Sequence, residues 1–324
     1  MMAIIITVVV LLVIVTGVQI LKIAELKAIS QGEKIYEVSE KESKSQAYLM
    51  LVFLVFYFGF FAWQVVAYGD RMLPVSASAH GVGIDSLMTV TMAFIIPVFI
   101  ITHILLFWFA YKYTYSSKRK ATFFSHSNKL EMIWTIIPSL ALTVLILYGL
   151  SNWNSIMTPV AEDEEHVLIE LVGQQFSWGA RYAGEDGKLG RANVNYIEGT
   201  NFIGVDASDA NANDDVIVKG EFHLPVNVPV QFVFRSSDVM HSAYMPHFRA
   251  QMNCVPGLKT QFNFVPTITT KEMKEITGNE DFEYILLCNK ICGAAHYNMQ
   301  MNIIVESKED YEKWLADQKT FAAN

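Results

Sequence analysis

Four long stretches of this 324-residue chain contain no Asp, Glu, Lys or Arg, and they constrain its fold more than any other feature. They cover residues 1–21, 45–69, 86–111 and 132–161. A helix needs about 20 predominantly apolar residues to cross a membrane, because lipid offers no partner for backbone amides. We therefore predict four membrane-spanning helices, over Ile4–Ile20, Ala47–Tyr68, Met88–Tyr111 and Ile133–Leu150.

These stretches have alternative interpretations. The first could be a cleaved signal peptide, but it has no basic leader and no A-x-A site, which favours a membrane anchor. The third and fourth carry Pro97 and Pro138, which would break a helix in a soluble protein but are tolerated in membrane helices. Buried helices of a soluble core are a further alternative, although four such stretches in succession favour the membrane.

The basic residues between the spans predict their orientation. Five lysines lie between residues 22 and 44, and five basic residues lie between residues 112 and 129, whereas the connection after the second span has only Arg71. Short cytoplasmic loops are enriched in Lys and Arg. We therefore expect both chain termini to lie outside the cytoplasm, in the periplasm of a bacterium.

The character of the chain changes at about residue 154, where alternating patterns typical of strands begin. These patterns predict strands over His166–Gly173, Val226–Phe234, Gln261–Val265, Phe282–Cys288 and Gln300–Glu306. Residues 184–219 are rich in Gly, Asp and Asn, which indicates a long loop or insertion. Short helices are expected over Lys271–Ile276 and Lys308–Gln318, the second after a capping pattern at Ser307 and Asp310.

The charge of the chain is unevenly divided. Residues 1–153 carry 11 basic and 8 acidic side chains, whereas residues 154–324 carry 13 basic and 24 acidic ones. An acidic surface argues against a nucleic-acid partner, because phosphates attract basic surfaces. The three cysteines of the chain are too few for a disulfide framework.

The residues that point to chemistry are concentrated between two predicted strands. The segment from Cys288 to Met299 also contains Cys292 and His296, and His241 lies in an earlier predicted turn. Thiolate, thioether and imidazole ligands together suit copper better than a hard cation. Two thiolates bridging two copper ions, each completed by one histidine, would share one unpaired electron.

Three alternatives to copper remain at this stage. A disulfide between Cys288 and Cys292 would leave the histidines and Met299 unexplained. A structural zinc ion bound by both cysteines, His241 and His296 has acceptable chemistry but gives Met299 no role. The third alternative is that these are unrelated buried residues.

From about Ser86 onward the chain resembles subunit II of cytochrome c oxidase, in the haem-copper oxidase superfamily. The motifs that carry the resemblance are Glu131–Pro138, Gly173–Trp178, Asp238–Ser242, Val255–Gly257 and Cys288–Met299. The resemblance implies an α+β membrane protein whose four helices precede an extracytoplasmic, cupredoxin-like β sandwich. It divides the chain into an extra N-terminal hairpin (1–72), the subunit II hairpin (86–153) and a periplasmic copper domain (154–324).

The resemblance also implies a dinuclear copper centre, CuA, and a set of partners. Cys288 and Cys292 would bridge the ions, with His241 and His296 terminal, Met299 axial and the Lys290 carbonyl as the remaining ligand. Electrons would come from a c-type cytochrome or a haem c-bearing complex, within a supercomplex in some cases, rather than from quinol. They would pass to haem in subunit I, where haem and CuB reduce oxygen to water and protons are pumped. This chain alone should not reduce oxygen.

Several residues depart from the family pattern or have two interpretations. Many relatives carry a magnesium-binding Glu where this chain has Lys290, so we expect no magnesium ligand there. Phe176 and Trp178 could carry electrons from the donor or could simply pack the β domain. Glu131 could open a proton path or be a solvated charge at a helix start.

Three other residues have no predicted role in the copper site. His247 and Cys254 exceed its ligand count, and Cys254 should be a buried small residue. His103 should face a helix neighbour or subunit I inside the membrane. The absence of Cys-x-x-Cys-His in the sequence excludes a fused haem c domain.

Two rival functions are compatible with the same ligands. One is a subunit of another copper-dependent reductase, such as nitrous oxide reductase, although that family lacks the membrane hairpin. The other is a membrane-anchored zinc- or copper-binding module with a structural or delivery role.

Overall fold

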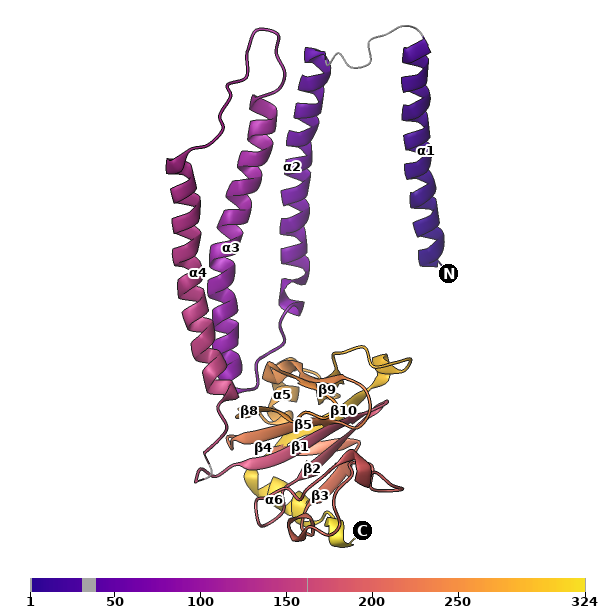
Figure 1. Ribbon diagram of the computed structural model, residues 1–324, viewed down its shortest axis with the longest axis vertical. Coiled ribbons are helices and arrows are strands. Elements are labelled where there is room, and N and C mark those ends of the chain that lie inside the picture. The colour runs from indigo at the N-terminus through magenta and orange to yellow at the C-terminus, as the bar shows by residue number, and fades with distance from the viewer. Residues whose placement is uncertain (1, 31–38, 162, 324) are drawn as a thin grey trace. The chain divides into compact units, whose positions relative to one another are not determined.

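The computed structural model describes residues 2–30, 39–161 and 163–323, which form long helices and a β domain (Figure 1). The chain divides into two compact units. One comprises Met1–Tyr68 and Ile96–Asn128, and the other comprises Gly69–Ile95 and Lys129–Asn324.

Four helices are long and apolar enough to cross a membrane, as predicted. They are α1 (Met2–Ser30), α2 (Glu40–Tyr68), α3 (Ala79–Lys112) and α4 (Asn128–Met157). Most of their apolar side chains are exposed, which is the pattern expected when lipid covers them. Pro97 lies inside α3 and Pro138 inside α4, and both helices continue through the proline.

In the first unit, aromatic side chains join α2 to the second half of α3. The His103 ring of α3 stacks on Tyr57 of α2 with ring centres 5.5 Å apart. Its Nδ1 lies 2.7 Å from the Phe99 carbonyl oxygen, one helical turn earlier. His103 therefore faces a neighbouring helix, which is one of the two environments predicted for it.

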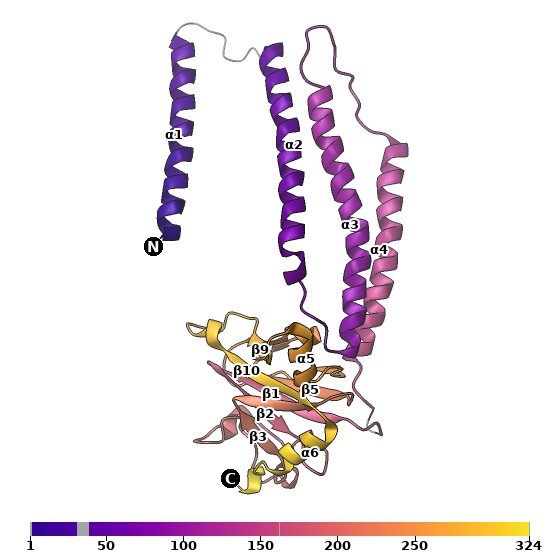
Figure 2. The same cartoon turned by 180° about the vertical axis from the view of Figure 1, so that it is seen from behind.

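The β domain is a sandwich of two five-stranded sheets, with orders β3-β2-β1-β5-β8 and β4-β10-β9-β6-β7 (Figures 1 and 2). The strands are β1 Val167–Gln174, β2 Ser177–Tyr182, β3 Val216–Lys219, β4 Glu221–Pro225, β5 Val230–Ser236, β6 His241–Met245, β7 Ala250–Cys254, β8 Thr260–Phe264, β9 Tyr284–Cys288 and β10 Gln300–Glu306. Buried residues of both sheets, such as Leu171, Phe232, Phe222 and Leu286, form one core. Helix α5 (Thr270–Thr277) packs against β10, and α6 (Lys308–Ala316) packs against β4.

All five predicted strands are present, but five others were not predicted. The missed strands are β2, β3, β4, β6 and β7, which have only four to six residues each. In β2 the alternation is hidden because Arg181, a charged residue, is buried among apolar ones. His241 was expected in a turn, but it is the first residue of β6.

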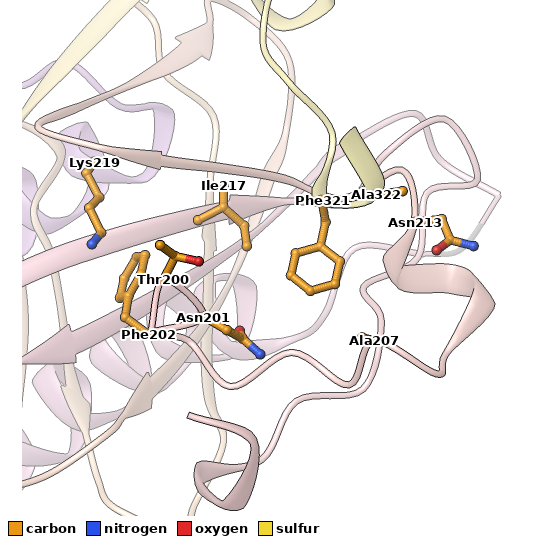
Figure 3. A pocket seen from close by; sticks show the side chains of 9 residues that line it. All are labelled: Thr200, Asn201, Phe202, Ala207, Asn213, Ile217, Lys219, Phe321 and Ala322. Atoms are coloured by element: carbon orange, nitrogen blue, oxygen red, sulfur yellow. The ribbon is translucent and has the colours of Figure 1, made fainter. Parts of the chain in front are cut away.

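The predicted insertion packs on the outside of the first sheet. Residues 184–215 contain short 3-10 turns, and Val216–Lys219 form β3. Ile203, Val205 and Ala212 of the insertion bury themselves against Val172 of β1. A cavity of about 880 Å³ lies between the insertion, β3 and the C-terminal segment, with Phe202, Ile217 and Phe321 in its wall (Figure 3).

The chain before α3 is part of the β domain. The Ala77 amide donates to the His247 carbonyl at 2.7 Å, and the Ala79 amide donates to the Val265 carbonyl at 3.0 Å. Arg249 has a left-handed φ of 52°, unusual for a residue other than glycine. Its guanidinium makes two 2.8 Å bonds to the carboxylate of Asp85 in α3. This ion pair ties the first part of α3 to β7.

A buried ion network holds the first sheet and the insertion together. The Glu170 carboxylate of β1 accepts bonds from Arg181 at 2.9 Å and from Arg235 at 2.5 Å. Arg181 also reaches Asp215 at 3.0 Å, and Arg235 donates to the Ile203 carbonyl. Burial disfavours ionised Glu170, but the guanidinium groups outweigh it and lower its pKa.

We predict that Glu170→Gln destabilises the β domain by about 3 to 5 kcal/mol, because two guanidinium groups would lose their shared buried partner. Urea unfolding of the full-length protein in detergent, followed by tryptophan fluorescence, measures the change. Since folding lowers the pKa of Glu170, its stabilising contribution is present above the unfolded pKa of about 4.3 and is lost as the pH falls. The two proteins should therefore converge in stability at acid pH.

Glu165→Gln is the matched control, because the Glu165 side chain is 73% exposed and pairs only with the exposed Lys308. It should unfold like the unchanged protein. If the Glu170→Gln protein were as stable as the unchanged protein at neutral pH, the result would contradict the role of the buried network.

Candidate metal centre

The predicted donor side chains converge at one end of the second sheet. Cys288 is the last residue of β9, and Cys292, His296 and Met299 follow in the connection to β10. β6 pairs with β9, with Ala243 opposite Cys288, and this pairing brings His241 beside the same connection. One ligand atom from each of His241, Cys288 and Cys292 lies within 4.8 Å of the others.

The distances between donor atoms connect all five side chains. The two Sγ atoms are 3.9 Å apart. His241 Nδ1 lies 3.8 Å from Cys288 Sγ, and His296 Nδ1 lies 3.7 Å from Cys292 Sγ. The Met299 sulfur is 3.8 Å from Cys292 Sγ. The site therefore has two sulfurs at its centre and one imidazole beside each.

A backbone oxygen completes the donor group. The Lys290 carbonyl lies 3.2 Å from Cys288 Sγ, so its oxygen faces the sulfurs while its side chain is exposed. The connection is closed by the Cys288 amide, which donates to the Met299 carbonyl at 3.0 Å. Six donors, two cysteine sulfurs, two histidine nitrogens, one methionine sulfur and one carbonyl oxygen, thus lie together. Five come from the end of β9 and its connection to β10, and His241 comes from β6.

Asp238 fixes the orientation of His241. Its carboxylate lies 2.8 Å from His241 Nε2, so Nε2 donates to it and the Nδ1 lone pair is directed at the sulfurs. The Gln175 and Val239 amides also donate to this carboxylate, at 2.7 and 2.6 Å. Burial disfavours the ionised form, but these hydrogen bonds outweigh it and lower the pKa of Asp238.

Two glycines allow the close packing around the donors. A Cβ at Gly173 would lie 2.9 Å from the His241 ring. Gly293 has a φ of 145°, and a Cβ there would lie 2.8 Å from the Phe176 ring. The Gln175 side chain next to Phe176 donates to the Cys292 carbonyl at 2.5 Å. The turn between β1 and β2 is therefore packed directly onto the donor connection.

The two aromatic candidates occupy different positions. Trp178 is 2% exposed, and its ring centre is 6.0 Å from that of His241. Phe176 is 36% exposed and covers Gly293 beside Cys292. Trp178 thus packs the interior, whereas Phe176 lies between the donor connection and solvent.

The geometry bears on two alternatives to a metal site, a disulfide and a set of unrelated buried residues. The cysteines are free, with sulfurs farther apart than a disulfide bond, and the convergence of the donors favours a common site over unrelated buried residues. Cys254 is buried opposite His241 on β7, outside the donor set, and burial raises the pKa of its thiol to about 12. His247 packs against Phe282 and Tyr284 instead.

Glu131 lies away from this donor set, in the exposed first turn of α4. That position suits a negative charge at a helix start.

The sequence analysis missed the residues that support the donors. Asp238 and Gln175 were named only as parts of motifs, and Gly293 was not given a role. A usable signal was the Asp238-x-x-His241 spacing, since histidine ligands commonly donate their second nitrogen to a carboxylate.

Comparisons with known proteins agree with this architecture. The family model "Cytochrome C oxidase subunit II, transmembrane domain" matches residues 63–151, and the model of its periplasmic domain matches residues 167–308. "Alternative cytochrome c oxidase subunit 2" of Bradyrhizobium diazoefficiens is 35% identical over 237 residues, which cover 72% of this chain and 80% of that protein. "Probable cytochrome c oxidase subunit 2" of Rickettsia bellii is 29% identical over 62% of this chain and 66% of that protein.

Among solved structures, the periplasmic domain of subunit II of cytochrome oxidase from Bradyrhizobium japonicum matches with a TM-score of 0.33 and 21% identity. The match covers 49% of this chain and 95% of that one. Four helices long and apolar enough to cross a membrane, a β sandwich and the two family models that match most of the chain lead to one assignment. This chain belongs to the cytochrome c oxidase subunit II family.

Proposed function

We propose that this chain is the electron-accepting subunit of a cytochrome c oxidase and that its β domain holds the dinuclear copper centre CuA. The observation that carries the proposal is the convergence of two cysteine sulfurs, two histidine Nδ1 atoms, one methionine sulfur and one carbonyl oxygen at one end of the sandwich. Membership in the subunit II family supports it.

The donor set fits copper better than zinc. A tetrahedral zinc site needs four ligands and would leave Met299 and the Lys290 carbonyl without a role, whereas thiolate, imidazole and thioether donors together suit copper. When bound, such a centre accepts and releases one electron at a time. The protein's contribution is a preformed site in which Asp238 orients His241, and burial of His241 and Met299 excludes water.

We predict that Cys288→Ala abolishes dinuclear copper binding, because one of the two central sulfurs is removed. The full-length protein should be purified, supplied with copper, and measured for copper and zinc content and for its electron-spin signal. The unchanged protein should bind two copper ions that share one unpaired electron. One zinc ion per chain, or a single blue copper, would contradict the proposal.

Cys254→Ala is the matched control, because it removes the third buried thiol, which is not one of the proposed donors. It should retain both copper ions. Loss of copper in both variants to the same extent would indicate a general folding defect rather than a ligand role for Cys288.

The surface near the donors has the character of a docking area. Met240, Ile291 and Tyr297, each next to a donor residue in the sequence, are 42%, 85% and 87% exposed. Exposed apolar groups of this kind mark interaction sites. We assign this end of the domain to contacts with subunit I and with the electron donor, and we assign Phe176 to the point where electrons enter.

We predict that Phe176→Leu slows electron transfer from a c-type cytochrome severalfold, because it removes the aromatic ring that lies between solvent and the donor connection. Reduction of the assembled oxidase by the native donor is measured by stopped flow, with copper content as a check. Tyr196→Leu alters an exposed aromatic in the insertion and should have no effect. If the rate of electron transfer were unchanged in the Phe176→Leu protein, the Phe176 ring would have only a packing role.

The acidic charge of residues 154–324 would attract a basic c-type cytochrome. We predict that the association rate falls steeply as salt is raised, because the Debye length shrinks from about 30 Å at 0.01 M to about 8 Å at 0.15 M. Stopped-flow association of cytochrome c with the assembled oxidase at several ionic strengths measures this. A rate that does not change with salt would contradict electrostatic steering.

The remaining assignments follow from the same proposal. The chain is placed in a bacterial inner membrane with the copper domain in the periplasm, and oxygen reduction and proton pumping take place at haem and CuB in subunit I. Glu131 is proposed to open a proton path into subunit I. Proton uptake that is unchanged in an oxidase carrying Glu131→Gln would contradict this role. Residues 1–72 form the additional hairpin, and no magnesium ligand is assigned to the Lys290 side chain.

A further inference from the structure

A small cavity lies between the first turns of α2 and the last turn of α3, within the first unit. Its volume is about 240 Å³, and its walls are formed by Lys44, Ala47, Tyr48, Tyr111, Lys112 and Thr114. The part of α2 that lines it precedes residue 63, where the family match begins. The cavity therefore lies between the additional helix α2 and residues 111–114 of the family match, and it shares no residue with the proposed copper site.

The chain that follows α3 is fastened to α2 and gives the cavity a defined wall. The Tyr115 amide donates to the Ser43 hydroxyl at 3.1 Å. The Glu40 carboxylate accepts the amide and the hydroxyl of Ser117 at 2.5 and 2.6 Å. Ala47 is only 4% exposed between the two segments. The opening is thus part of a packed helix pair.

The cavity carries positive charge that the carboxylates around it offset only in part. Lys44 and Lys112 both line it, and among residues 39–161 and 163–323 no carboxylate lies within 4.0 Å of either ammonium group. Glu40, one turn from Lys44, interacts with it electrostatically, while one oxygen of its carboxylate accepts hydrogen bonds from Ser117. Arg119 donates to the carbonyls of Lys112 and Thr114, which adds a third cation close by.

Hydroxyl groups and interfacial aromatic rings accompany this charge. The Tyr48 and Tyr111 hydroxyls are 3.5 Å apart, and Thr114 adds another hydroxyl to the wall. Trp108, 46% exposed, packs against Tyr111. Tyrosine and tryptophan are enriched at the headgroup level of membranes, and basic pockets between membrane helices bind anionic headgroups.

We propose that this cavity binds the phosphate headgroup of an anionic phospholipid. The two ammonium groups balance its charge, the tyrosine and threonine hydroxyls donate to its oxygens, and the exposed apolar side chains of α2, such as Val55 and Phe56, provide a surface for the acyl chains. With the proposed orientation of the helices, the lipid comes from the cytoplasmic leaflet. Its role is to fix the additional hairpin to α3.

The test uses the full-length protein in detergent, incubated with mixed micelles that contain either phosphatidylglycerol or phosphatidylcholine. Native mass spectrometry then counts the lipids retained. We expect one retained phosphatidylglycerol per chain and no retained phosphatidylcholine. The double variant Lys44→Gln/Lys112→Gln should bind phosphatidylglycerol about thirtyfold more weakly, at about 1 kcal/mol for each lysine.

Lys118→Gln/Lys120→Gln is the matched control, because it removes the same charge from exposed positions in the segment after α3 without altering the cavity wall. It should retain the lipid. Equal loss in both double variants, or equal retention of both lipids, would overturn the proposal. Displacement of phosphatidylglycerol by millimolar inorganic phosphate would also overturn it, since the site would then recognise free phosphate. Circular dichroism and copper content check that each variant is folded.

Discussion

The donor cluster depends on the antiparallel pairing of β6 with β9, which sets Ala243 opposite Cys288 and Tyr244 opposite Leu287. Side chains alternate between the faces of a strand, so a slip of one residue would turn His241 away from the sulfurs. The buried residues His241, Ala243 and Met245 hold the register, because they form the inner face of β6. The apolar core of the sandwich therefore determines the position of a polar site at its end.

The first sheet contributes to that site through the turn between β1 and β2 and through Gly173 and Trp178, which pack against His241. Gln175, between β1 and β2, donates from its amide to Asp238 and from its side chain to the Cys292 carbonyl. The same sheet is stabilised on its outer face by Glu170 and the two arginines that hold the insertion. Since the donor connection is packed against one sheet and built from the other, the site requires the complete sandwich.

The first part of α3 and the segment before it are bonded to the β domain. In the second unit, Asp85 and Arg249 join α3 to β7, while the segment before α3 pairs with residues on both sides of that strand. Residues 77–79 therefore pair with the β domain although they precede the last two long helices or begin the first of them.

The sequence by itself determined the four long apolar helices and five strands and indicated the candidate donor residues, because these depend on local patterns: uninterrupted apolar runs, alternation over five or more residues and soft ligands at short spacing. Only the tertiary structure decided that His241 joins Cys288, that Asp238 orients it and that Phe176 rather than Trp178 is exposed. It also decided that Arg181 is a buried residue of β2, since burial of a charge becomes favourable only when Glu170 and Asp215 are brought to it from elsewhere in the chain. These contacts join residues far apart in sequence, and local patterns carry no information about such pairings.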